Sequence, residues 1–85
     1  MKQFDYVIKD KLGIHARPAG LLVKEAGKFT SSITIAKGET KADAKKIFGL
    51  MGLGVKCGDT IMTTVDGTDE DTAIAVLEKF MKATW

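Results

Sequence analysis

The sequence predicts an α+β fold in which three helices cover one face of a mostly antiparallel sheet, in the order β-α-β-β-α-β-α. Three observations support this prediction. Apolar and polar residues alternate in several short segments, as they do in half-buried strands. Apolar residues recur at helical spacing in two longer segments, and glycines separate the segments. With 85 residues and no repeat or linker, residues 1–85 are expected to form a single domain with one core.

The first strand and the first helix are predicted from apolar spacing. In residues 3–9, three apolar side chains alternate with polar ones: Phe4, Tyr6 and Ile8. The helix is expected over residues 16–28, where apolar residues recur at Ala19, Leu22, Val23, Ala26 and Phe29. Pro18 suits the first turn, because the N–H that proline lacks would have no partner there. Gly27 is expected near the end of this helix.

The remaining strands are predicted from a hairpin pattern and a second alternation. Residues 32–36 and 40–44 are expected to pair around a turn at residues 37–39. After a turn at residues 58–59, residues 61–65 alternate as the fourth strand. These strands, with the first, make the predicted sheet.

The last helix is expected to begin at a capping box formed by Thr68 and Asp71. Acidic residues in its first turn and lysines near its end suit the helix dipole. Four apolar residues form its expected buried stripe: Ala73, Leu77, Phe80 and Met81.

Residues 45–54 are harder to interpret, because three glycines interrupt a run of large apolar side chains. The glycines favour a short helix followed by a loop. A short helix can turn only about three of the five large apolar residues inward. The pattern therefore leaves open whether Phe48 and Met51 pack in the core or form an exposed surface.

The segment around His15 is the candidate functional site. It contains the only histidine, the only arginine (Arg17) and the only proline (Pro18) of the chain, and Gly13 gives the preceding loop conformational freedom. The start of the helix supplies unpaired N–H groups and a partial positive charge, and Arg17 adds a cation. These features should lower the pKa of His15 and stabilise a phosphoryl group on a neutral, exposed imidazole.

Composition and charge exclude several classes of function. The net charge is +2, with most cations in the first 46 residues and acidic residues clustered late, which predicts a basic face for an acidic partner. No basic run is interleaved with aromatic residues, so a nucleic-acid partner is not expected.

One histidine without clustered ligands argues against a metal, and neither a cofactor nor a redox role for Cys57 is expected. Without an export signal, a membrane-length apolar run or a second cysteine, the expected location is the cytoplasm.

The segment Leu12-Gly13-Ile14-His15-Ala16-Arg17-Pro18-Ala19 resembles the phosphorylation-site signature of HPr, the phosphocarrier of the bacterial phosphoenolpyruvate-dependent sugar phosphotransferase system. Residues 45–54 resemble the second-helix segment of that family, and residues 67–70 resemble the start of its last helix. The similarity covers essentially the whole chain in one register.

The resemblance implies an open-faced β-sandwich with a four-stranded antiparallel sheet and three helices on one face. It implies a monomeric, non-enzymatic carrier whose His15 accepts a phosphoryl group on Nδ1 from enzyme I and passes it to sugar-specific IIA proteins or domains. It also implies that Arg17 and the backbone of Ala16 and Arg17 stabilise the phosphate. The expected docking surface consists of Gly20, Lys24, Lys45, Lys46, Ile47, Phe48, Met51 and Gly52, although neighbouring lysines such as Lys45 and Lys46 more often form an ordinary solvated face.

Lys46 departs from the pattern of many relatives, which carry a regulatory serine at this position. The departure calls into question regulation by HPr kinase and the co-repressor role that depends on it. A carrier of a nitrogen-related phosphotransfer chain is the alternative function, because that branch shares the histidine motif. A regulatory relative would be expected to lack His15, and a small enzyme would need a second acid or base near it.

Overall fold

The computed structural model describes residues 1–14 and 16–85. Helices and strands alternate along the chain in the order that the sequence predicts. Their bounds are β1 Lys2–Val7, α1 Ala16–Ala26, β2 Ser32–Lys37, β3 Thr40–Asp43, α2 Ile47–Gly52, β4 Thr60–Asp66 and α3 Glu70–Thr84.

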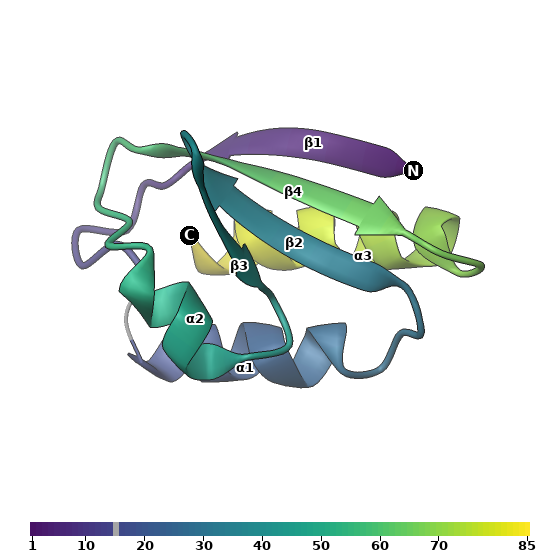
Figure 1. Ribbon diagram of the computed structural model, residues 1–85. Coiled ribbons are helices and arrows are strands. Elements are labelled where there is room, and N and C mark those ends of the chain that lie inside the picture. The colour runs from purple at the N-terminus through teal and green to yellow at the C-terminus, as the bar shows by residue number, and fades with distance from the viewer. Residues whose placement is uncertain (15) are drawn as a thin grey trace.

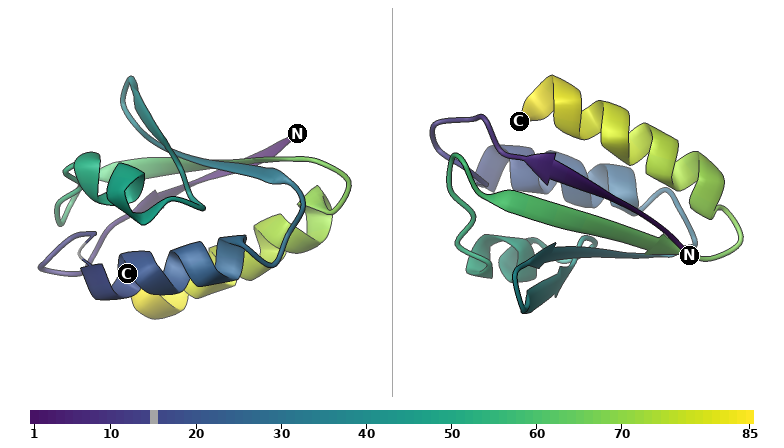
Figure 2. Two further views of the ribbon diagram at one scale, coloured as in Figure 1. Left: turned by 60° about the horizontal axis from the view of Figure 1, so that its bottom comes forward. Right: turned by 90° about the horizontal axis from the view of Figure 1, so that it is seen from above.

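The four strands form one antiparallel sheet in the order β1-β4-β2-β3. Tyr6 pairs with Ile61 between β1 and β4, and Ile33 pairs with Val65 between β2 and β4. The two central strands, β4 and β2, are therefore far apart in sequence. The helices lie on one side of the sheet, and the other face carries none (Figures 1 and 2). The predicted α+β architecture, an open-faced sandwich, is confirmed.

The core lies between the sheet and the helices. Alternate side chains of the central strands enter it, as the period of two requires. Burial of each large aliphatic side chain stabilises the fold by about 1.5–3 kcal/mol. Among the described residues, the largest fully buried apolar side chains are Ile8, Leu22, Ile33, Ile35, Leu50, Ile61, Leu77, Met81 and Val65. This packing holds α1 and α3 against the sheet and so sets the direction of α1.

Element ends differ slightly from the sequence prediction. Helix α1 ends at Ala26 rather than at residue 28, because the amides of Lys28 and Phe29 form tighter turn bonds to Glu25 and Ala26. In α3, Phe80 is only half-buried and meets Trp85 edge to face, with ring centroids 6.0 Å apart. The other three residues of the predicted stripe are fully buried.

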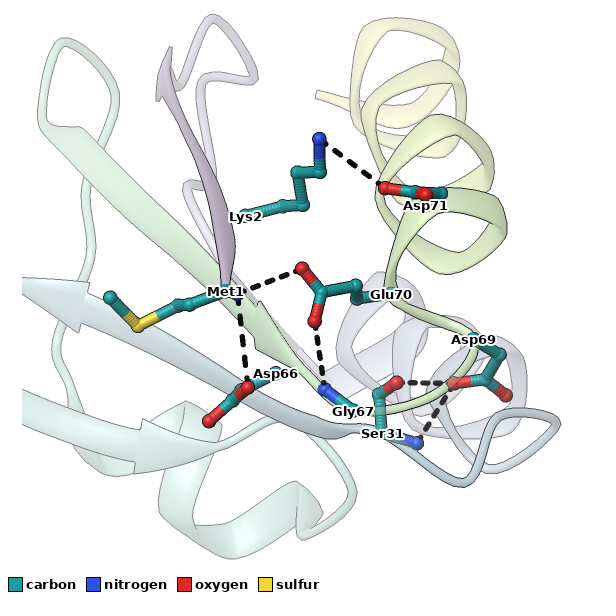
Figure 3. Close-up of polar contacts among 8 residues, drawn as sticks. All are labelled: Met1, Lys2, Ser31, Asp66, Gly67, Asp69, Glu70 and Asp71. Carbon is teal, nitrogen blue, oxygen red and sulfur yellow. Dashed lines mark hydrogen bonds and ion pairs between the residues drawn. The ribbon is translucent and has the colours of Figure 1, made fainter.

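The predicted capping box at the start of α3 is wrong. Helix α3 begins at Glu70, and its N-cap residue is Asp69, whose side chain makes no capping bond. The Asp69 carboxylate instead accepts hydrogen bonds from the amides of Thr30 (2.9 Å) and Ser31 (3.0 Å) and from the Ser31 hydroxyl (Figure 3). These bonds join the start of α3 to the loop between α1 and β2.

We expect the Asp69 bonds to make stability pH-dependent. The Ser31 hydroxyl and the Thr30 amide lower the pKa of Asp69 from 3.8 to about 2. Folding therefore favours the charged carboxylate, so this contribution is present above about pH 4 and is lost as the pH falls toward 2. Asp69→Asn should lower the free energy of unfolding at neutral pH, and the difference from the parent should shrink on acidification. Urea unfolding curves across this pH range measure this difference in the free energy of unfolding.

Asp71→Asn is the matched control, because the Asp71 side chain is 82% exposed and, among the described residues, its carboxylate pairs only with the ammonium of Lys2, at 3.3 Å, a side chain that is itself 53% exposed. Its effect at neutral pH should be smaller. Equal losses from the two variants would contradict the assignment of the stabilisation to Asp69.

Candidate functional site

Helix α1 begins directly after His15, at Ala16. Ala16 and Arg17 are exposed, while Pro18 is buried within the first turn. The first turn holds no acidic residue. Positive potential at this turn comes from its unpaired amides, from the positive end of the helix dipole and from the Arg17 cation, and no acidic side chain of the turn offsets it. This end of α1 favours an anion.

His15 lies outside the described residues. The expectations that its ring is exposed, stays neutral at its reacting nitrogen and has a lowered pKa therefore remain predictions. Its neighbours on both sides are described, and they define the backbone that carries it.

The loop before His15 rests against the loop between α2 and β4. Gly13 has φ +66°, and a Cβ atom there would lie 2.2 Å from the carbonyl oxygen of Val55. The amide of Ile14 donates a hydrogen bond of 3.2 Å to the same oxygen. The sequence predicted that Gly13 allows a close backbone approach, and the structure identifies Val55 as its neighbour.

Helices α1 and α2 lie side by side, next to this loop (Figure 1). The Ile47 side chain packs over Gly20, which leaves room for it because a Cβ atom there would lie 3.7 Å from Ile47 Cδ1. Leu50 is buried, whereas Phe48 is 87% and Met51 41% exposed. The open question about these two residues is thus resolved: they belong to the surface.

The predicted lysines are not equivalent. Lys24 and Lys46 are exposed, but Lys45 is half-buried and its ammonium donates a 2.8 Å hydrogen bond to the carbonyl oxygen of Phe29. Lys45 therefore ties the start of α2 to the loop after α1. Lys24 and Lys46 are the cations of this set that remain free to meet a partner.

The helical pattern predicts that Leu21 faces outward, and Leu21 is 49% exposed. Sequence reasoning missed the exposure of Leu12, which is 71%, and the surroundings of Leu21. A hollow of about 200 Å³ lies there, lined by Asp10, Arg17, Pro18, Leu21 and Thr84. Because Thr84 comes from the end of α3, only tertiary packing brings this lining together. Leu21 therefore adds exposed apolar area beside Arg17.

The described residues contain no cluster of three or more histidine, cysteine, aspartate or glutamate side chains that could hold a metal ion. Within the same residues, no helix has both the length and the apolar character needed to span a bilayer.

Comparison with known proteins agrees with this geometry. Residues 2–83 match the family model described as the PTS HPr component phosphorylation site. The chain is 43% identical over 81 residues to the phosphocarrier protein HPr of Mycoplasma capricolum subsp. capricolum, an alignment that covers 95% of this chain and 91% of that protein. It is also 45% identical over 75 residues to the HPr-like protein Crh of Halalkalibacterium halodurans, covering 88% and 89% of the two chains.

A solved structure is equally similar. The histidine-containing phosphocarrier protein of a mycoplasma superposes with a TM-score of 0.94 at 42% identity, over 98% of this chain and 94% of that one. The fold and the helix start thus define a small phosphocarrier domain. The chain belongs to the HPr family of phosphocarrier proteins.

We expect Gly13→Ala to destabilise the loop that carries His15. A left-handed backbone costs an alanine about 1–2 kcal/mol, and the collision with Val55 adds to this cost. Gly38→Ala is the matched control, because Gly38 has a similar φ of +59° with nothing within 4 Å of the added Cβ atom. Urea unfolding should show a clearly larger loss for Gly13→Ala. Losses of the same size would mean that the contact with Val55 is readily relaxed.

Proposed function

We propose that this protein accepts a phosphoryl group on His15 from enzyme I and passes it to sugar-specific IIA proteins or domains, in the cytoplasm. One observation carries the proposal: the only histidine of the chain directly precedes a helix whose first two residues are exposed and whose first turn is free of acidic residues and cationic at Arg17. Membership of the HPr family supports it.

The chemistry requires the imidazole to be neutral at Nδ1, which attacks phosphorus while the bond from phosphorus to the donor breaks. The product carries about two negative charges. The amides of Ala16 and Arg17 and the Arg17 guanidinium favour this anion, and they disfavour an imidazolium in the free protein. The protein would act as a stoichiometric carrier rather than as an enzyme, since the partners supply the catalysis.

The proposed docking surface lies next to the helix start. Phe48 and Met51 supply exposed apolar area, and Gly20 allows Ile47 to fill the space between the two helices. Lys24 and Lys46 supply positive charge at its edge, which suits an acidic partner surface. Gly52, at the end of α2, is exposed as well.

Similarity to an HPr-like protein named Crh raises the alternative of a regulatory role. Two residues favour the carrier instead. His15 provides the acceptor that a purely regulatory relative would be expected to lack. Lys46 removes the hydroxyl that HPr kinase would modify, so we expect no modification by that kinase at this position. The choice between a sugar and a nitrogen-related chain depends on which partners dock.

The decisive experiment is phosphorylation by enzyme I and phosphoenolpyruvate. We expect one acid-labile phosphoryl group on the protein, because phosphohistidine is hydrolysed in acid. His15→Ala should abolish the labelling while retaining the fold, as judged by circular dichroism. Intact-mass spectrometry and peptide mapping measure the outcome. A phosphoryl group on another residue, or none at all, would refute the proposal.

Substitutions on the proposed docking surface should separate binding from stability. Phe48→Ala should weaken binding to enzyme I about tenfold, since exposed aromatic residues at interface centres carry much of the binding energy. The free energy of unfolding should change by less than about 0.5 kcal/mol, because Phe48 is 87% exposed. Calorimetry and urea unfolding measure the two effects.

Met51→Ala and Met62→Ala form a matched pair for the same experiment. The two methionines are 41% and 39% exposed, but Met62 lies on β4, away from the proposed surface. Only Met51→Ala should weaken binding. Equal weakening by both variants would argue against docking at α2, as would a loss of about 3 kcal/mol of stability on Phe48→Ala.

A further inference from the structure

The loop between α2 and β4 supports the backbone on both sides of the segment that leads to His15. Before that segment, the Ile8 amide donates to the Asp59 carbonyl oxygen (2.9 Å), and the Gly58 amide donates to the Ile8 carbonyl oxygen (2.7 Å). After it, Ile14 is bonded to Val55. Residues 9–13 thus lie between two attachment points on this loop, and the Lys9 amide makes a further hydrogen bond of 2.8 Å to the carbonyl oxygen of Trp85. A shift of the α2–β4 loop would displace the backbone at Ile8 and at Ile14.

Lys37 bonds to both ends of the supporting loop. Its ammonium donates a hydrogen bond of 3.0 Å to the carbonyl oxygen of Gly54 and forms an ion pair of 3.0 Å with Asp59 Oδ2. The same carboxylate oxygen accepts the amide of Lys56 at 2.8 Å. Lys37 is the last residue of β2, so these contacts anchor the loop to a central strand of the sheet.

Figure 1 shows how the contacts come together at one end of the molecule. The α2–β4 loop lies at the end of the sheet where the β2–β3 hairpin turns, and the loop that leads into α1 lies at the same end. The Lys37 and Asp59 side chains are 35% and 33% exposed, so water only partly screens their ion pair. The Lys56 amide and the Lys37 ammonium also lower the pKa of Asp59, which keeps its carboxylate charged.

We propose that Lys37 is a positioning residue for the phosphorylation site, holding the α2–β4 loop in the place from which Val55 and Asp59 support the segment that carries His15. This inference rests on the proposed function for its kinetic consequence. Its structural part does not depend on phosphotransfer. Lys37 does not touch the reacting group, and it acts through Gly54 and Asp59.

The test compares three variants. Lys37→Met removes the ammonium and keeps a long apolar stem, and Lys37→Arg restores two donors and the charge. Lys41→Met is the matched control, because Lys41 is an exposed lysine of the same hairpin whose ammonium forms no ion pair or hydrogen bond within residues 1–14 and 16–85. None of the three changes replaces a fully buried side chain, since Lys37 is only partly buried and Lys41 is exposed.

Amide hydrogen exchange of the free protein tests the structural part. Lys37→Met should accelerate exchange of the Ile14 amide about tenfold relative to the amides of β4, which report global unfolding. Lys37→Arg should restore the slower exchange, and Lys41→Met should leave it unchanged. Unchanged exchange at Ile14 in Lys37→Met, or the same acceleration in Lys41→Met, would overturn the proposal.

The kinetic consequence is tested by measuring the rate of phosphoryl transfer from enzyme I while the concentration of this protein is varied. Lys37→Met should lower kcat about fivefold with KM changed less than twofold, because misplacement of a reacting group slows the chemical step more than docking. A rise in KM alone would overturn a positioning role. If the parent protein accepts no phosphoryl group, the proposed function fails, and the exchange data alone decide whether Lys37 holds the loop.

Discussion

The contact between Gly13, Ile14 and Val55 is the interaction on which the geometry of the site depends. A phosphoryl carrier must expose its acceptor to two partners, so the acceptor cannot be held by burial of its own side chain. The backbone must therefore be fixed from behind. In this protein Ile14 is 8% exposed and its amide is bonded to Val55, while Leu12, two residues earlier, is 71% exposed. Within two residues, the chain passes from an exposed position at Leu12 to a buried, hydrogen-bonded position at Ile14.

Burial of α1 fixes the direction of the helix dipole that the site uses. Ala19, Leu22 and Ala26 are fully buried along one face of α1, and small residues at two of these positions let the helix approach the sheet closely. Arg17, Leu21 and Lys24 lie on the opposite, exposed face of α1. The same helix can therefore be a packed element of the core and supply the positive end of the proposed anion site, because the two roles use different faces and different atoms.

The parts of the fold that depend on local pattern could be predicted, and the parts that depend on long-range contacts could not. Alternation in residues 61–65 and helical spacing after Pro18 predicted strand β4 and helix α1. The capping box failed because α3 begins one residue later than the box requires. The Thr68 hydroxyl and the Asp69 carboxylate contact Thr30 and Ser31, 38 or 39 residues away, and a short-range pattern does not predict such partners.

The candidate site shows the same division. Gly13 could be recognised from the sequence, because a glycine just before the first turn of a predicted helix indicates a loop that needs conformational freedom. Val55 and Lys37 were not, since their role arises only when the α2–β4 loop folds back on the loop before α1. The exposure of Phe48 could not be decided either, because α2 has only six residues, too few for a periodic pattern to identify its buried face.

Shuttling between two partners also limits how strongly the proposed docking surface can bind. If enzyme I and the IIA proteins use the same surface, each must leave before the other can dock, so slow dissociation would halt the transfer. The arrangement at α2 suits this requirement. Its exposed apolar area comes mainly from Phe48 and Met51, and the exposed cations Lys24 and Lys46 would accelerate encounter with acidic surfaces more than they would prolong it. The same argument applies to the proposed phosphoryl group, because amides and one exposed guanidinium would hold the anion without burying it, and the next acceptor could still remove it.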